Sequence, residues 1–289
     1  MEAEKKSCSI TIKDDRDDHK DSSEEQELSL SIEKLNLVVP KKKKLLVMNL
    51  NGFLLHRFIH RHILRDGRYV PNPILGSRRA DSISGNFLRK ISFYHILNNV
   101  VYIVNCDLVF KRPFSEEFMK FCLERFEVGI WSSAQEHNID GALDLAIGEE
   151  SKNKLLFVWN QDQCRQTNTA SKESNEKPIY FKELQKVWEK VEKGGPYSAS
   201  NTLMIGDKPY KAYLNPENTA IFAKSYDPED KEDNALDPNG ELCEYLKGVA
   251  EAEDVQSYVK NNEFGIPEIT EDNSEWFFYF RVLFGELMV

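Results

Sequence analysis

Two asparagines that follow a short apolar run are the side chains best placed to do chemistry in this sequence. Asn49 and Asn51 come directly after Leu45–Met48, and Gly52 follows them. An unbroken apolar run of this length is typical of a strand buried on both faces of a parallel sheet. Ligands bind such sheets at the carboxyl ends of the strands, so the spacing predicts a site at the two asparagines.

Strand and helix patterns alternate along most of the chain. Strands are predicted at Leu45–Met48, Val128–Trp131, Leu155–Trp159 and Leu203–Ile205, with a strand pair in Val100–Phe110, a polar loop at Gln166–Glu176, and helices at Glu116–Arg125, Asn138–Ile147, Glu183–Lys193 and Glu241–Val249. This alternation is typical of a doubly wound α/β fold, with a parallel sheet and helices on both faces. Ser132 and Asp207 follow two of these strands, and Lys182 precedes one of the helices.

Five blocks, in this order, resemble the FCP/SCP-type RNA polymerase II carboxy-terminal-domain phosphatases of the HAD superfamily. The blocks are Lys111-Arg112-Pro113, Phe126–Ala134, Asp162-Gln163-Cys164, Tyr180–Leu184 and Leu203–Pro209. The likeness covers about Lys43 to Tyr226. The plant FCP-like subgroup is similar through Lys177-Pro178 and Asn215–Ala220. The resemblance implies a HAD-like sheet with a small flap or cap inserted after the first strand.

The resemblance assigns catalysis to two aspartates at the positions of Asn49 and Asn51. The first aspartate attacks phosphorus, and the second transfers a proton to and from the oxygens. Amides keep the shape of these side chains but can neither form an acyl phosphate usefully nor cycle a proton. Loss of such a nucleophile lowers a rate by a factor on the order of 10⁵–10⁶. No catalytic residue is therefore intact, and a pseudophosphatase is predicted.

Phosphate binding is expected to be retained although the catalytic aspartates are replaced. The resemblance places Ser132, a hydroxyl at a strand end, and Lys182, a positive charge, against the phosphate. The alternatives are a strand cap for Ser132 and a surface lysine for Lys182. Asn49 adds an amide N–H that can donate to a phosphate oxygen, where a carboxylate would repel it.

Magnesium binding is expected to be weak. The resembled family holds Mg²⁺ with the first aspartate, the backbone carbonyl of the second, and an acid or amide at the Gly206-Asp207 position. Mg²⁺ requires an octahedral shell of oxygens with carboxylates to offset its charge. Only Asp207 keeps a charge here, and it could instead be a turn residue before Lys208.

Composition narrows the classes of partner and location. The formal net charge of −10 argues against direct nucleic-acid binding. The 5 cysteines form no paired CxxC spacing, which favours reduced thiols in a nuclear or cytoplasmic protein. No apolar signal core and no membrane span are expected. The partner is expected to be a protein that is phosphorylated or acidic.

Three regions are predicted. Residues 1–40 form a disordered acidic tail, residues 41–250 form the FCP-homology domain, and residues 251–289 form a C-terminal docking segment. The flap, at about residues 56–95, is rich in arginine. Such a flap could attract anions to the site, or it could be a surface loop that balances an acidic body.

Three functions compete for this sequence. The first is an impaired pseudophosphatase that binds a phosphorylated or acidic protein. The second is an active or weakly active protein serine/threonine phosphatase of the carboxy-terminal-domain type. The third is an import-translocase-like subunit of the same fold. The two asparagines favour the first of these.

Overall fold

The structure is a computed structural model that describes residues 42–65, 68–69, 82–84, 91–96, 99–171 and 174–285; within residues 58–108 and 174–176 it describes the backbone alone. The acidic tail expected at residues 1–40 therefore lies outside the described residues. The described residues belong to the compact unit that begins at Lys42.

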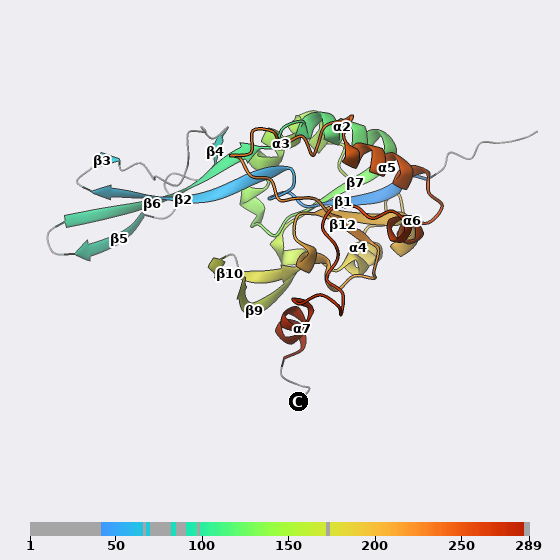
Figure 1. The fold of residues 1–289 in the computed structure, drawn as a ribbon. Helices are drawn as coiled ribbons and strands as arrows, with labels where there is room; N and C mark the ends of the chain where they lie inside the picture. The colour runs from blue at the N-terminus through green and yellow to red at the C-terminus, as the bar shows by residue number, and fades with distance from the viewer. Residues whose placement is uncertain are drawn as a thin grey trace, which may run out of the picture. The chain divides into compact units, whose positions relative to one another are not determined.

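A parallel sheet of five strands forms the centre of this unit (Figure 1). Its strands are β12 (Ala220–Phe222), β11 (Thr202–Gly206), β1 (Lys44–Met48), β7 (Phe126–Trp131) and β8 (Phe157–Trp159), in that spatial order. Every neighbouring pair is parallel. The predicted doubly wound α/β fold is confirmed, and β1 lies in the middle of the sheet.

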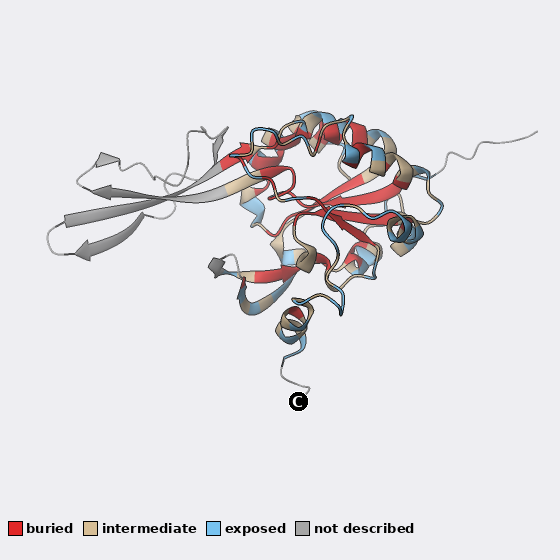
Figure 2. Ribbon diagram, viewed as in Figure 1, coloured by how far each residue is buried: buried red, intermediate tan, exposed pale blue. Residues whose placement is uncertain are grey.

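Helices cover both faces of the sheet because the side chains of β1 alternate between two cores. Leu46 and Met48 pack into one core with residues of α2 (Ser115–Arg125), α3 (Asp140–Lys152) and α5 (Glu241–Glu251). Leu45 and Val47 pack into the other with α4 (Leu184–Lys190). Every residue of β1 is buried, as the red central strands of Figure 2 show. An unbroken apolar run is therefore what this position requires.

The segment after β1 forms a second, antiparallel sheet. Its long strands are β2 (Leu55–Arg65) and β6 (Asn99–Lys111), paired from Leu55 with Lys111 to Arg65 with Val101. Three further strands, β3 (Arg68–Tyr69), β4 (Ser82–Ser84) and β5 (Ile91–Ile96), pair with these two. The strand pair expected within Val100–Phe110 is wrong: this stretch is one strand, and its partner precedes it in the chain.

The polar loop expected at Gln166–Glu176 is also wrong. The chain forms an antiparallel pair of strands there, β9 (Arg165–Ser171) and β10 (Ser174–Phe181). Polar side chains do not prevent a hairpin, since its ladder is made by backbone groups. Ile179 and Phe181 are buried, so β10 holds Lys182 at the edge of the core.

The C-terminal part of the chain packs against the domain through aromatic side chains. It contains α6 (Val255–Asn261) and α7 (Trp276–Phe284). Tyr279 of α7 is buried; it stacks on Tyr210, with ring centroids 5.2 Å apart, and meets Phe181 edge-on. No helix in the described part of the chain has the length and apolar character that crossing a membrane needs.

Candidate functional site

The sheet register brings three strand ends together. Met48, the last residue of β1, lies opposite Ile205 of β11 on one side and Ile130 of β7 on the other. Asn49 follows directly, and Asp207 and Ser132 follow the two neighbouring strands. The carboxyl ends of three adjacent parallel strands thus bring Asn49, Ser132 and Asp207 to one edge of the sheet, the edge at which ligands bind in folds of this kind.

A glycine lets the turn after β1 approach Asp207. Gly52 has φ +87°, a conformation that other residues rarely adopt. A Cβ at this position would lie 2.0 Å from Oδ2 of Asp207. Any side chain on residue 52 would therefore displace either the turn or the carboxylate.

The Asn49 amide links a cationic and an anionic side chain. Its Oδ1 accepts a hydrogen bond from Nζ of Lys182 at 2.8 Å. Its Nδ2 donates to Oδ1 of Asp207 at 2.8 Å and to the backbone oxygen of Asn51 at 2.7 Å. Asn49 is only 3% exposed, so these bonds use the donors and the acceptor of the amide inside the protein.

Lys182 is a buried residue, which contradicts the alternative of a surface lysine. Its side chain is 2% exposed and its backbone N–H donates to the oxygen of Lys211. Burial lowers the pKa of the Lys182 ammonium to about 7, and the charge of Lys211 acts in the same direction. Cys164 and Asp207 partly oppose this shift. Near neutral pH this group can therefore take up or release a proton.

Asp207 is held as an ionised carboxylate. Burial works to raise its pKa, but Lys211, a hydrogen bond from Ser225, and then Lys208 and Lys182 outweigh burial and lower it. Oγ of Ser225 donates to Oδ2 at 2.9 Å, and Nζ of Lys211 lies 3.6 Å from Oδ1. Sequence reasoning missed Ser225 and Lys211. The spacing of four residues from Asp207 to Lys211 was the one signal available for either.

Two predicted residues do not join this network. Ser132 is buried, but its Oγ accepts from the backbone N–H of Ala134 at 3.1 Å, which matches the alternative of a strand cap. Asn51 is exposed, and its Oδ1 accepts from the backbone N–H of Arg57 at 2.7 Å. The structure therefore brings Asn49, Lys182 and Asp207 into direct contact and leaves the side chains of Ser132 and Asn51 beside them.

A buried arginine is hydrogen-bonded to the turn after β1. Arg112 is 0% exposed and forms a two-pronged ion pair with Asp233, at 2.9 and 2.8 Å. It also donates to the backbone oxygens of Phe53 and Lys224. Arg112 thus ties the turn after β1 to the segment that carries Ser225. In the sequence, this arginine stands out only as part of the Lys111-Arg112-Pro113 motif.

The donor set does not fit a magnesium ion. The resemblance assigns the metal to three places, and two of their atoms, the Asn51 backbone oxygen and Oδ1 of Asp207, accept hydrogen bonds from Nδ2 of Asn49. A cation there would face an N–H₂ group, with a single carboxylate to offset its charge. Among the residues described, no group of three His, Cys, Asp or Glu side chains is arranged to hold a metal.

Comparisons with known proteins define the family. The model of the NLI interacting factor-like phosphatases matches residues 44–256, so the chain belongs to that family. An FCP1 homology domain-containing protein of Schizosaccharomyces pombe is 28% identical over 178 residues, which are 57% of this chain and 69% of that protein. The ubiquitin-like domain-containing CTD phosphatase 1 of Xenopus tropicalis is 26% identical over 50% of this chain and 43% of its own length.

Two solved structures also match, at low similarity. A variant of the fission yeast RNA polymerase II CTD phosphatase Fcp1, bound to beryllium fluoride, is 14% identical with a TM-score of 0.35, over 68% of this chain and 46% of that one. A second structure of Fcp1 is 13% identical with a TM-score of 0.37, over 88% and 64%. The chain is therefore an FCP1-homology, CTD-phosphatase-like domain by its family match and its own topology.

We expect magnesium to stabilise an Asn49→Asp variant but not the wild type. The substitution would turn an N–H₂ group into an oxygen facing Asp207 and the Asn51 carbonyl, which completes a set of oxygens that suits Mg²⁺. Magnesium at tenfold its Kd would add about 1.4 kcal/mol, a shift that thermal melts in Mg²⁺ and in EDTA can resolve.

The matched control is Asn51→Asp, which keeps an acceptor for Arg57 and adds no oxygen beside Asp207. Its melting temperature should not depend on magnesium. An equal shift in the wild type, or none in Asn49→Asp, would contradict the assignment of the Asn49 amide to the metal position.

Replacing Lys182 by methionine should alter how stability depends on pH. The folded pKa of about 7 lies below the ordinary value of 10.5, so between these values the unfolded chain holds a proton that the folded chain has released. Stability contributed by this group therefore rises with pH, by about 1 kcal/mol per unit, and Lys182→Met should lose that slope. Urea titrations between pH 7.5 and 9.5 measure it. Lys190→Met, on the exposed part of α4, should keep the wild-type slope; parallel slopes for all three proteins would refute the shift.

Proposed function

We propose that this domain is a catalytically impaired member of its family that binds a phosphorylated or acidic segment of a protein partner. The single observation that carries the proposal is the Asn49 amide, fixed between Lys182 and Asp207 by hydrogen bonds of 2.8 Å each. We place the protein, with this function, in the nucleus or the cytoplasm.

The impairment follows from the atoms at the strand end. Oδ1 of Asn49 is a neutral acceptor already bonded to Lys182, and Nδ2 has no lone pair to offer a phosphorus atom. Asn51 cannot exchange a proton near neutral pH, and its Oδ1 is bonded to the backbone of Arg57. Neither step of a two-step phosphoryl transfer has a group to perform it.

Binding is supported by Lys182. An ammonium has three donors, and within the described residues the Lys182 side chain makes one hydrogen bond, to Asn49. A buried donor that lacks an acceptor is costly, and a phosphate supplies several strong acceptors. A bound anion would also favour the charged form of a lysine whose pKa is about 7. The neighbouring Asn51 is exposed, so the cluster lies directly beneath the surface.

The wild type should show no magnesium-dependent turnover of an aryl phosphate. Its rate should lie on the order of 10⁵–10⁶ below that of an active relative, because the nucleophile is missing. The matched variant is Asn49→Ala, which should give the same background. A turnover that Asn49→Ala abolishes would establish the alternative, a weakly active serine/threonine phosphatase.

A phosphoserine peptide should bind more tightly than its unphosphorylated twin, with EDTA present. A pair from the polymerase carboxy-terminal domain is apt, because the relatives are named for that substrate. We expect about a tenfold preference in fluorescence anisotropy, weakening with salt as charge-assisted binding does. Lys182→Met should abolish the preference and Lys190→Met should retain it. Equal affinity for the two peptides would mean that this site binds no phosphate.

A further inference from the structure

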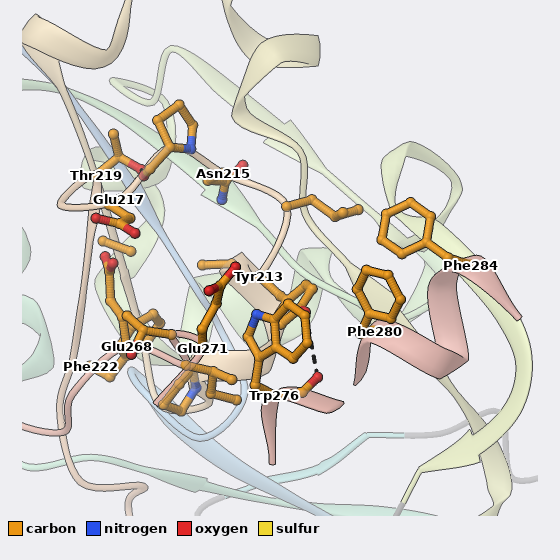
Figure 3. A pocket seen from close by; sticks show the side chains of 17 residues that line it. Tyr213, Asn215, Glu217, Thr219, Phe222, Glu268, Glu271, Trp276, Phe280 and Phe284 are labelled. Atoms are coloured by element: carbon orange, nitrogen blue, oxygen red, sulfur yellow. Dashed lines mark hydrogen bonds between the residues drawn. The ribbon is translucent and has the colours of Figure 1, made fainter. Parts of the chain in front are cut away.

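A cleft of about 410 Å³ lies away from the strand ends, beside the C-terminal helix α7. It is formed by the chain that follows the short 3-10 helix η4 (Pro209–Ala212), by residues 268–271, and by α7 itself. In Figure 3 the rings of Trp276, Phe280 and Phe284 follow one another along α7, Glu217 and Glu268 lie across the cleft from Phe280 and Phe284, and Glu271 lies beside Trp276. We call it the aromatic–acidic cleft. Its size is that of an ordinary ligand site, about 300–1,000 Å³.

The aromatic side is a ladder of rings on one face of α7. Trp276, Phe280 and Phe284 are four residues apart, so they lie above one another on the helix. Trp276 stacks on Phe280 with centroids 4.9 Å apart and planes 19° apart, and Phe280 meets Phe284 at 5.0 Å. Tyr213 donates a hydrogen bond to the backbone oxygen of Trp276 at 3.4 Å, which fastens the start of the helix. The ladder therefore presents flat, partly exposed ring surface to the cleft.

The cleft is also lined by three carboxylates and by no basic side chain. Glu217, Glu268 and Glu271 line the cleft, and no lysine or arginine does. Within the part of the chain that the structure describes, none of the three is ion-paired. Glu268 is half-buried and accepts a hydrogen bond from the backbone N–H of Asn218 at 3.2 Å. Burial raises the pKa of Glu268, while N–H groups of Asn218 and Ala220 partly lower it again.

We propose that the aromatic–acidic cleft binds an arginine side chain from a basic segment of a protein partner. A guanidinium can stack on aromatic faces while its edge donates paired hydrogen bonds to a carboxylate. Residues 261–280 contain five acidic residues and no basic one, so the surrounding chain also attracts a cation. An apolar occupant would leave the Glu268 carboxylate buried without a counter-charge, which is unfavourable.

Arginine fits this cleft better than lysine. The ammonium of lysine is compact and strongly hydrated, and it presents no flat surface to the Trp276–Phe280 stack. The cleft is separate from the proposed phosphate site, because Asn49, Lys182 and Asp207 do not line it. The two sites together would recognise segments of opposite charge.

The test compares a labelled hexapeptide of alternating glycine and arginine with the same peptide built from citrulline, which keeps the planar group but has no charge. Anisotropy with the full chain should show about a tenfold loss on exchange to citrulline. The double variant Glu217→Gln, Glu268→Gln should lose about as much affinity for the arginine peptide. Glutamine keeps the acceptor for Asn218, but the two substitutions remove both charges. Trp276→Ala should weaken the arginine peptide through lost stacking.

The control is Glu229→Gln, which removes one charge from an exposed residue outside the cleft and should change affinity less than twofold, as expected of a screened surface charge. Three results would overturn the proposal: equal binding of the two peptides, which would indicate an apolar occupant; an equal loss in Glu229→Gln, which would indicate unspecific attraction; and no binding of the arginine peptide at millimolar concentration.

Discussion

The contact on which the site depends is a neutral amide held between a cation and an anion. Asn49 offers its oxygen to Lys182 and its N–H₂ group to Asp207, so one side chain satisfies both partners without carrying charge. The three residues directly follow β1, β10 and β11, and the amide therefore joins segments that are distant in the sequence. A carboxylate in its place would attract Lys182 and repel Asp207, and a metal ion would be needed to offset that repulsion.

Hydrogen bonds of Arg112 and Tyr226 hold the backbone around this contact. Arg112 connects the backbone at Phe53 to Lys224 and Asp233. The backbone N–H of Tyr226 donates to Gly52, and its hydroxyl donates to the backbone of Lys111. These hydrogen bonds connect three segments: the turn after β1, the residues just before α2, and the strongly acidic stretch near Asp233. Removing one partner of such a buried ion pair is costly, because it leaves the other charge uncompensated.

The sequence was most informative where burial dictates a pattern. The apolar run at β1 and the alternation of strands and helices predicted the parallel sheet, and the motif resemblance assigned Asn49 and Asp207 to one site. The motif resemblance added Lys182, whose burial no local pattern reveals. Sequence reasoning failed where backbone pairing decides the structure, as in β9 and β10, and where a contact spans distant segments, as for Ser225 and Arg112. The role of the arginine-rich flap near residues 56–95, whether it attracts anions or balances an acidic body, stays a prediction. Most of its side chains lie outside the described residues.

The turn after β1 also bears on how this protein ages. Asn51-Gly52 is the kind of pair that loses ammonia most readily in flexible peptides, because the glycine nitrogen can attack the neighbouring amide carbon. Here the Gly52 nitrogen donates to the oxygen of Leu55 at 2.7 Å, and the Asn51 amide oxygen is bonded to the N–H of Arg57. The first bond engages the attacking nitrogen and the second fixes the orientation of the Asn51 side chain, so spontaneous hydrolysis to a carboxylate should be slow. The turn that positions the strand end should thus also slow the chemical conversion of its exposed asparagine.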